Sequence, residues 1–502
     1  MKGFLQTAKS ELAGVTQQRG PNTGYPASQP QHHADHSGAA GQQQPNHIRD
    51  PTPLDIIRYR YHHGTNLGSI YVVERWLRES RFPKGAKGRS ELSAVKAWVN
   101  KIGIEATQRK FEDHWASAVT EEDLQWLRNK AKCTTIRLPI GYFDMPSPEF
   151  TRGTPFEPYA QVYRGAWHSI RSLIARFRAH SIGVLVDMHA LPGGGNIDIH
   201  AGTDSGRADL WTSASNRALA VRCLEFLARE AQTGLDIAGI QVVNEVDWDA
   251  PGMYEWYDDC ITAISAIDSS IPVIISDAWN LPKAIDYTLR KNSVSTHQPT
   301  TPVVVDTHCY WAFDDADKKK TPQQITSEVP ATLRDLDGKD GSVHNRGATQ
   351  VIVAGGSFFW TWKMDWMPGG EWGFKEQTDL GSVVPPRYAR LSQQERISIL
   401  QRVIHEREGC MRRAIDQHVG YWSQADPQGY YEHDKYEYGW RVGFQDAFTF
   451  FEGRNTQGDK IGMLELWVLK RIRESGYRGG FTWLFEQGLR KGVQDFYAVA
   501  GL

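Results

Sequence analysis

The chain has 502 residues, of which 40% are hydrophobic, and it carries a formal net charge of −2 at pH 7. The hydrophobic fraction is sufficient for a large core, while the nearly neutral charge argues against nucleic acid as a partner, because binding to phosphates requires a basic surface. The 18 Trp and 19 Tyr residues suit either core packing or stacking against sugar rings. Composition alone favours neither use.

The start of the chain and its cysteines bear on cellular location. Residues 1–20 lack the continuous apolar stretch of a signal peptide, and no segment is apolar enough to span a membrane. The sequence has no Asn-x-Ser/Thr sequon, and its cysteines are odd in number and lack metal-site or disulfide spacing: Cys133, Cys223, Cys260, Cys309 and Cys410. We expect an intracellular, cytoplasmic protein. The alternative is a short amphipathic N-terminal helix that gives weak membrane association or mitochondrial targeting.

Residues 17–50 are rich in Gln, His, Pro, Gly and Ser. Such a composition cannot bury enough apolar surface to order itself, so we expect residues 1–50 to form a disordered N-terminal tail. Its histidines could bind a metal, but a tail is the favoured interpretation.

From Tyr61 onward, short apolar runs alternate with helical stretches, which is typical of parallel βα units. The runs begin at Tyr61, Thr134, Gly183, Ala238, Ile271, Pro302 and Ser357. Most are continuously apolar, as strands buried on both faces should be. The pattern predicts an α/β fold, a (β/α)8 barrel over residues 51–386, with polar strand ends gathered on one face where barrel active sites lie.

After Pro386 helical periodicity dominates, in Leu391–Gln424, Tyr436–Phe451 and Asp459–Ser475. We expect residues 387–502 to form a helical C-terminal extension packed on the barrel. The extension has no catalytic motif of its own, and it could instead provide a surface for a protein partner.

The run IQVVNEV places Asn244 and Glu245 at the end of a buried strand. Partial burial raises the pKa of a carboxyl group, so Glu245 could hold a proton near neutral pH and act in acid–base catalysis. An Asn-Glu pair is common, however, and Glu245 could equally lie in an ordinary surface loop. Other strand ends add Arg137, His189 and His308, each of which could alone be a structural residue.

Taken together and in order, these motifs resemble glycoside hydrolase family 5, near the fungal exo-β-1,3-glucanases and their intracellular relatives. The resemblance extends from GTNLGSIYVVERW at Gly64 to EWGFKEQTDLGSVVPP at Glu371. It implies a (β/α)8 fold, no cofactor or metal, and retaining hydrolysis of a β-glucoside or β-glucan. By resemblance, Glu245 is the proton donor, Asn244 contacts the sugar 2-hydroxyl, and the rest of the site is Glu74, Arg137, His189, His308, Tyr310 and one of Trp360 and Trp362.

The second carboxylate that a retaining enzyme needs is not found. The family places it at the end of the seventh strand, but here QVIV and SFFWTW are separated only by Ala354, Gly355 and Gly356. A crossover between parallel strands takes at least about 10–12 residues. We therefore predict a damaged seventh βα unit, with the nucleophile deleted between Val353 and Gly355. Other carboxylates are poor substitutes: Glu371, Asp365 and Asp306.

Three hypotheses follow. The chain is a β-glucoside hydrolase by lineage, nearly inactive because it lacks the nucleophile. Alternatively, it is a non-catalytic protein that binds carbohydrate or glucolipid in the retained pocket. A third possibility is a scaffold that uses its helical extension. The sequence does not distinguish oligoglucans from lipid glucosides as the substrate.

Overall fold

The computed structural model describes residues 47–292, 301–310, 355–453 and 458–502, with scattered positions between 313 and 328. The predicted N-terminal tail, except for its last four residues, lies outside the described residues, as does the predicted seventh strand QVIV at 350–353. Within the described part of the chain, no helix is long and apolar enough to cross a membrane.

The described strands are all parallel. They are β1 (His62–Thr65), β2 (Thr135–Gly141), β3 (Gly183–Ala190), β4 (Gly239–Gln241), β5 (Val273–Ser276), β6 (Val303–Asp306) and β7 (Gly356–Phe359). Strands β2 to β6 pair in chain order, β7 pairs with β1, and a parallel bridge between Asn66 and Arg137 joins the two sheets. This is the strand order of a (β/α)8 barrel in which β7 takes the place of the eighth strand and closes on the first.

The sequence explains why these strands are internal. Every residue of β2 and β3 is buried, as the continuous apolar runs predicted. Gly64 in β1 lies so close to β2 that an added Cβ would come within 1.8 Å of the Thr135 carbonyl oxygen. Only glycine fits this approach without a shift of the backbone.

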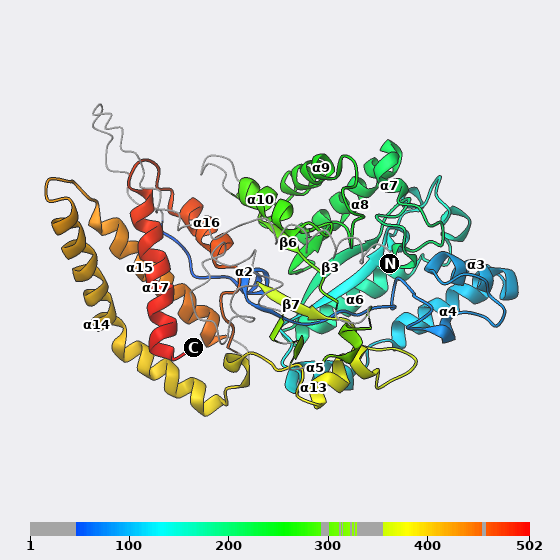
Figure 1. The fold of residues 1–502 in the computed structure, drawn as a ribbon, viewed down its shortest axis with the longest axis horizontal. Coiled ribbons are helices and arrows are strands. Elements are labelled where there is room, and N and C mark those ends of the chain that lie inside the picture. The colour runs from blue at the N-terminus through cyan, green and yellow to red at the C-terminus, as the bar shows by residue number, and fades with distance from the viewer. Residues whose placement is uncertain are drawn as a thin grey trace.

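Helices cover the outside of the barrel (Figure 1). Several begin with a side-chain cap, for example Thr120 before α5 and Ser213 before α8. The outer helices of the barrel are α3 (Glu91–Ile102), α4 (Ile104–Ser117), α5 (Glu121–Asn129), α6 (Ala166–Ala179), α7 (Asp209–Thr212), α8 (Ala214–Gln232), α9 (Met253–Ser265), α10 (Leu281–Asn292) and α13 (Phe374–Asp379).

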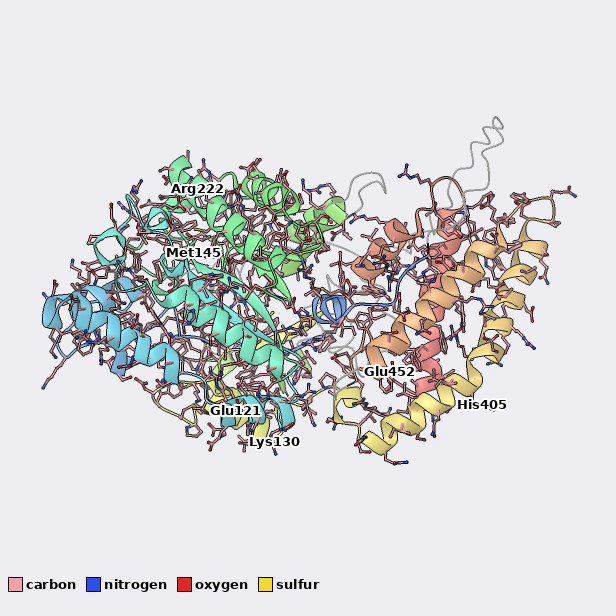
Figure 2. The ribbon with its side chains drawn as sticks, turned by 180° about the vertical axis from the view of Figure 1, so that it is seen from behind. Glu121, Lys130, Met145, Arg222, His405 and Glu452 are labelled. Carbon is pink, nitrogen blue, oxygen red and sulfur yellow. The ribbon has the colours of Figure 1, made fainter. Side chains whose placement is uncertain are left out.

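The C-terminal part is helical and lies to one side of the barrel (Figure 1). Figure 2 shows the same part from behind, with His405 and Glu452 labelled on it. Its helices are α14 (Gln393–Ala425), α15 (His433–Glu452), α16 (Leu464–Ser475) and α17 (Thr482–Ala500). The first three occupy the segments in which helical periodicity was noted, whereas α17 lies within the predicted helical extension but was not named as a separate helix.

The helical part contacts the chain just before β1. Tyr61 N donates to Lys460 O (2.9 Å), Gly462 N donates to Tyr59 O (2.9 Å), and Arg60 pairs with Asp459 (3.3 Å). Helix α2 (Pro53–Tyr59) leads into this contact. Since these residues precede β1, the helical part meets the barrel at the amino end of that strand, away from the strand ends that carry the polar residues.

Candidate active site

The polar residues at the carboxyl ends of the strands converge. Arg137 lies in β2 and His189 in β3, while Asn244 and Glu245 follow β4 and His308 and Tyr310 follow β6. Glu245 is 8% exposed. Its Oε1 accepts hydrogen bonds from His308 Nδ1 and from the Tyr310 hydroxyl, both at 2.6 Å. The structure thus brings together residues from strands that are far apart in the sequence.

The charge state of Glu245 differs from the expectation. Burial on its own raises the pKa of this carboxyl, but the hydrogen bond and charge of His308, the charge of His200 and the Tyr310 hydroxyl together hold the pKa well below its usual range. The prediction of a raised pKa is therefore wrong for the unliganded site. At rest Glu245 is a carboxylate, which is the form that acts as a base.

His308 bridges two carboxylates. Its Nε2 contacts Asp306 Oδ2 at 2.9 Å, while its Nδ1 contacts Glu245. Burial lowers the pKa of His308, but Asp306 and Glu245 outweigh burial and raise the pKa to about 10. The pKa of Asp306 falls to about 2, because His308 and Arg137 outweigh its burial. The imidazolium therefore fixes Glu245 by a charge-assisted hydrogen bond.

Arg137 is committed to a buried network. It donates to Gln241 Oε1 (2.7 Å), Asn66 Oδ1 (2.8 Å) and Asn244 Oδ1 (2.7 Å), and it lies 3.1 Å from Asp187. Since Arg137 takes the amide oxygen of Asn244, the Asn244 NH2 group is left to donate toward a ligand. This orientation is compatible with the contact to a sugar hydroxyl that the resemblance implies.

Two buried polar atoms near Glu245 have no hydrogen-bond partner among the described residues: His189 Nε2 and Glu74 Oε1. Asp187 accepts from His189 Nδ1 at 2.6 Å, and burial lowers the pKa of His189 to about 4. Burial raises the pKa of Glu74, whose other oxygen accepts from Trp76 Nε1 at 2.9 Å. A buried polar atom without a partner costs free energy, so these two atoms are suited to meet ligand hydroxyls.

The structure shows which of the two tryptophans, Trp360 or Trp362, belongs to the site, a choice that the sequence left open. The Trp360 ring stacks on His189, with ring centroids 5.8 Å apart and planes 6° apart. Trp362 is 2% exposed and packs between Trp126 (5.2 Å) and Phe374 (6.2 Å). Trp362 is therefore a core residue, and its prediction as a site residue is wrong, because its ring is enclosed by aromatic side chains of α5 and α13.

Several residues near the site were missed. His200 lies in the short 3-10 helix η5 (Ile199–Ala201), with Nε2 3.3 Å from Glu245 Oε2. Trp372 lies 6.4 Å from Tyr310 and 5.3 Å from Trp76, so these rings form a rim beside Glu245. The missed residues His200, Trp76 and Trp372 lie in turns and short 3-10 helices between the main elements, where the sequence has no periodicity that predicts a position.

The described carboxylates that could replace a nucleophile are either engaged elsewhere or exposed. Asp306 holds His308, and Asp365 accepts from the Ser80 amide at 2.6 Å. Glu371 is an exposed residue of η8 (Gly370–Trp372). The predicted deletion between Val353 and Gly355 lies outside the described residues, because Val353 and Ala354 are not among them, and it stays a prediction. The described residues also contain no group of three or more potential metal ligands.

Comparison with known proteins decides the family. The model of the cellulase family (glycosyl hydrolase family 5) matches residues 96–353, slightly more than half of the chain. The chain belongs to glycosyl hydrolase family 5. A second family model, "Glucan 1,3-beta-glucosidase 3 C-terminal domain", matches residues 403–500. The predicted family and the barrel fold are confirmed, and the helical part has its own recognised relatives.

Two fungal relatives match both parts of this family 5 chain. Glucan 1,3-beta-glucosidase 3 of Schizosaccharomyces pombe is 29% identical over 464 residues, 87% of this chain and 95% of that protein. A glycosyl hydrolase of Saccharomyces cerevisiae is 28% identical over 482 residues, 88% of this chain and 92% of that protein. Glucan 1,3-beta-glucosidase of Yarrowia lipolytica is 26% identical over 280 residues, 53% of this chain and 61% of that protein.

Proposed function

We propose that this family 5 chain binds β-glucosides in the manner of a glucan 1,3-β-glucosidase, with Glu245 as its acid/base. The observation that carries the proposal is the Glu245 carboxylate held by His308 and Tyr310 at 2.6 Å, at the carboxyl ends of barrel strands. The names of the fungal relatives support the glucosidase assignment. The unpartnered atoms of His189 and Glu74, beside the stacked Trp360, provide polar and apolar contacts for one glucose ring.

In a retaining hydrolase the acid/base first protonates the leaving oxygen while a second carboxylate attacks the anomeric carbon. The same residue then removes a proton from the water that releases the sugar. Glu245 supplies the acid/base in both steps. With the attacking carboxylate deleted, as predicted, the first step has no nucleophile, and this chain is expected to bind its ligand and hydrolyse it very slowly.

A binding protein without turnover is the second candidate function. It is favoured by the short connection 354–356 between the sequence runs QVIV and SFFWTW, which leaves no room for a strand-end loop and helix. The scaffold hypothesis depends instead on the helical part. Both oligoglucans and lipid glucosides remain candidate ligands, because the rim formed by Trp76, Tyr310 and Trp372 can receive a second sugar or an apolar aglycone.

The experiment measures binding and hydrolysis with the full chain. Calorimetric titration with laminaribiose, a β-1,3-linked disaccharide, is compared with titration with the α-linked disaccharide maltose, and release of a chromogenic aryl β-glucoside is followed in parallel. We expect laminaribiose alone to bind, and Trp360→Ala to weaken its binding about tenfold or more, because one stacking face is lost. The matched control is Tyr421→Ala, an exposed aromatic on α14 that is 62% accessible and should leave the affinity unchanged.

The results distinguish the hypotheses. Binding of laminaribiose with very slow hydrolysis supports the proposal. Rapid hydrolysis shows that an attacking carboxylate is present and contradicts the predicted deletion. If neither β-glucoside binds nor reacts, the site is not a glucoside site and the scaffold hypothesis gains.

A further inference from the structure

A loop after β3 brings a second histidine to Glu245. His200 is 5% exposed, and its Nε2 lies 3.3 Å from Glu245 Oε2, the carboxylate oxygen that His308 and Tyr310 do not contact. Both oxygens of Glu245 therefore have partners, one from the loop after β3 and two from the segment after β6. The His200 contact belongs to a loop and not to a strand end.

Asn196, on the same loop, holds both His200 and the backbone of Glu245. Its Nδ2 lies 2.9 Å from Glu245 O, 3.2 Å from Asn244 O and 3.0 Å from His200 Nε2. Its Oδ1 accepts from the Asp198 amide at 3.0 Å, which fixes the orientation of the side-chain amide. Nδ2 has two protons and three neighbours that can accept one, so only two of the three contacts can be donated by Asn196 at a time.

The backbone that Asn196 contacts is unusual. Glu245 has φ +42°, in the left-handed region that residues other than glycine adopt only rarely. Such conformations cost free energy and persist when the surroundings determine them. The two hydrogen bonds from Asn196 to the carbonyls of Asn244 and Glu245 are a direct means of holding this turn.

The loop itself is anchored to α3. The Asp204 carboxylate accepts hydrogen bonds from Arg89 N (2.8 Å), from Ser90 Oγ (2.5 Å) and from Ser93 Oγ. Leu92 N donates to Gly202 O at 3.1 Å. These contacts fix the loop just after His200, while Asn196 fixes it just before, so the position of His200 is set on both sides.

We propose that His200 and Asn196 are positioning residues for Glu245, and that His200 exchanges hydrogen-bond partners when Glu245 changes its protonation state. When Glu245 is ionised, His200 donates its Nε2 proton to Oε2 and Asn196 donates both protons to the carbonyls. When the Nε2 proton of a charged His200 passes to Oε2, Glu245 becomes the protonated acid, and Nε2 of the ring, now neutral, accepts a hydrogen bond from the Glu245 hydroxyl or from Asn196. The inference rests on the proposed function, because an acid/base passes through both states in each reaction cycle.

Other charges face the same groups. Glu74, Asp198 and Asp247 surround the His200 side of Glu245, and the His189 ring lies 5.4 Å from that of His200. His308 and Tyr310 contact the other oxygen of Glu245. Within this set, the His200 charge is one of the contributions that lower the pKa of Glu245. Removing His200 should therefore raise it.

The test follows the titration of Glu245 directly. The full chain is labelled with 13C at the glutamate carboxyl carbons, and the Glu245 signal is assigned by its absence in Glu245→Gln. In His200→Ala we expect the midpoint of the Glu245 titration to move upward by about 1 pH unit, as expected when an opposite charge within about 4–6 Å is removed. His168→Ala is the control, because His168 is exposed on α6 and away from the site.

An unchanged Glu245 titration in His200→Ala, with the thermal midpoint of the protein retained, would overturn the proposal. If His200→Ala fails to fold, His200→Gln replaces it, since glutamine keeps an N–H donor without a titratable charge. An upward shift in that variant supports the proposal and no shift rejects it. The titration needs no turnover, so absent glucoside binding would reject the proposed function while leaving this result interpretable.

Discussion

Arg137 carries the largest share of the buried hydrogen bonds at the site. Its guanidinium and the Asp187 carboxylate are 3% and 0% exposed, so neither charge can be solvated if its partner is removed. The network fixes Asn244 next to Glu245. The stability of the site and the geometry of its proposed acid/base therefore depend on the same side chain.

We expect Arg137→Met to lower the free energy of unfolding by about 3–5 kcal/mol, because it leaves the Asp187 charge buried without its arginine partner. Denaturant unfolding of the full chain measures the change. The control is Arg207→Met, which removes an exposed pair with Asp209 (3.0 Å, Arg207 72% exposed) and should cost less than about 1 kcal/mol. Equal effects of the two substitutions would show that the network contributes little.

The His308 bridge makes stability depend on pH in a defined window. The pKa of His308 is raised from 6.5 to about 10, so its contribution is complete below pH 6.5 and is lost as pH rises toward 10. The pKa of Asp306 is lowered from 3.8 to about 2, so its contribution is present above pH 3.8 and is lost as pH falls toward 2. Both contributions are therefore present from pH 3.8 to 6.5.

The measurement compares the unfolding free energies of the unsubstituted chain and of His308→Ala at pH 6 and pH 9. We expect the difference to be larger at pH 6, since part of the His308 contribution is gone at pH 9. His168→Ala, which changes an exposed histidine, should show no such dependence. A difference that grows toward pH 9 would contradict the assigned charge of His308.

At the scale of elements, α15 and α17 pack through glycines. A Cβ on Gly443 would come within 2.0 Å of Leu489 O, and a Cβ on Gly492 within 2.1 Å of Trp440 O. The helix backbones are therefore nearly in contact, and the core of the helical part depends on this spacing. This close packing was not predicted from the sequence. No separate helix had been identified at α17, so the glycines of α15 had no neighbouring helix against which to be interpreted.

We expect Gly492→Ala to destabilise the helical part by about 1–3 kcal/mol or more, because the backbones must separate to admit a methyl group. Gly420→Ala on α14 is the matched control: nothing lies within 4 Å of its Cβ position, and alanine there should stabilise by about 0.5–1 kcal/mol through helix propensity. Thermal unfolding followed by circular dichroism measures the change in stability of both variants. Similar effects would mean that α15 and α17 are less closely packed.

The elements also show what could be predicted from the sequence. Strands β2 and β3 are continuously apolar and were found, because a strand buried on both faces leaves this pattern. The polar residues at the ends of the apolar runs correctly identified Arg137, His189 and Glu245 as neighbours at one face of the barrel. His200 and Asn196 could not be found, since a loop has no period and their contacts with Glu245 depend on its folded path.

The whole molecule combines a barrel with a helical part that contacts the amino end of β1 (Figure 1). The active-site residues lie at the opposite ends of the strands. The helical part therefore contributes no described side chain to the Glu245 cluster, and its effect on activity would act through the stability of the barrel.

The charge of Glu245 could not be predicted from local sequence, because it depends on His308, Tyr310 and His200, which are distant in the chain.

The central claim is that Glu245 is an acid/base in a family 5 site that lacks its attacking carboxylate. It is tested most directly by the product formed from 2,4-dinitrophenyl β-glucoside in the presence of azide. Azide should enter the vacated space, attack the anomeric carbon once and displace dinitrophenolate. A single displacement inverts the configuration, so the account predicts α-glucosyl azide. An azide-independent reaction, or β-glucosyl azide formed through two displacements, would show an intact nucleophile and contradict the account.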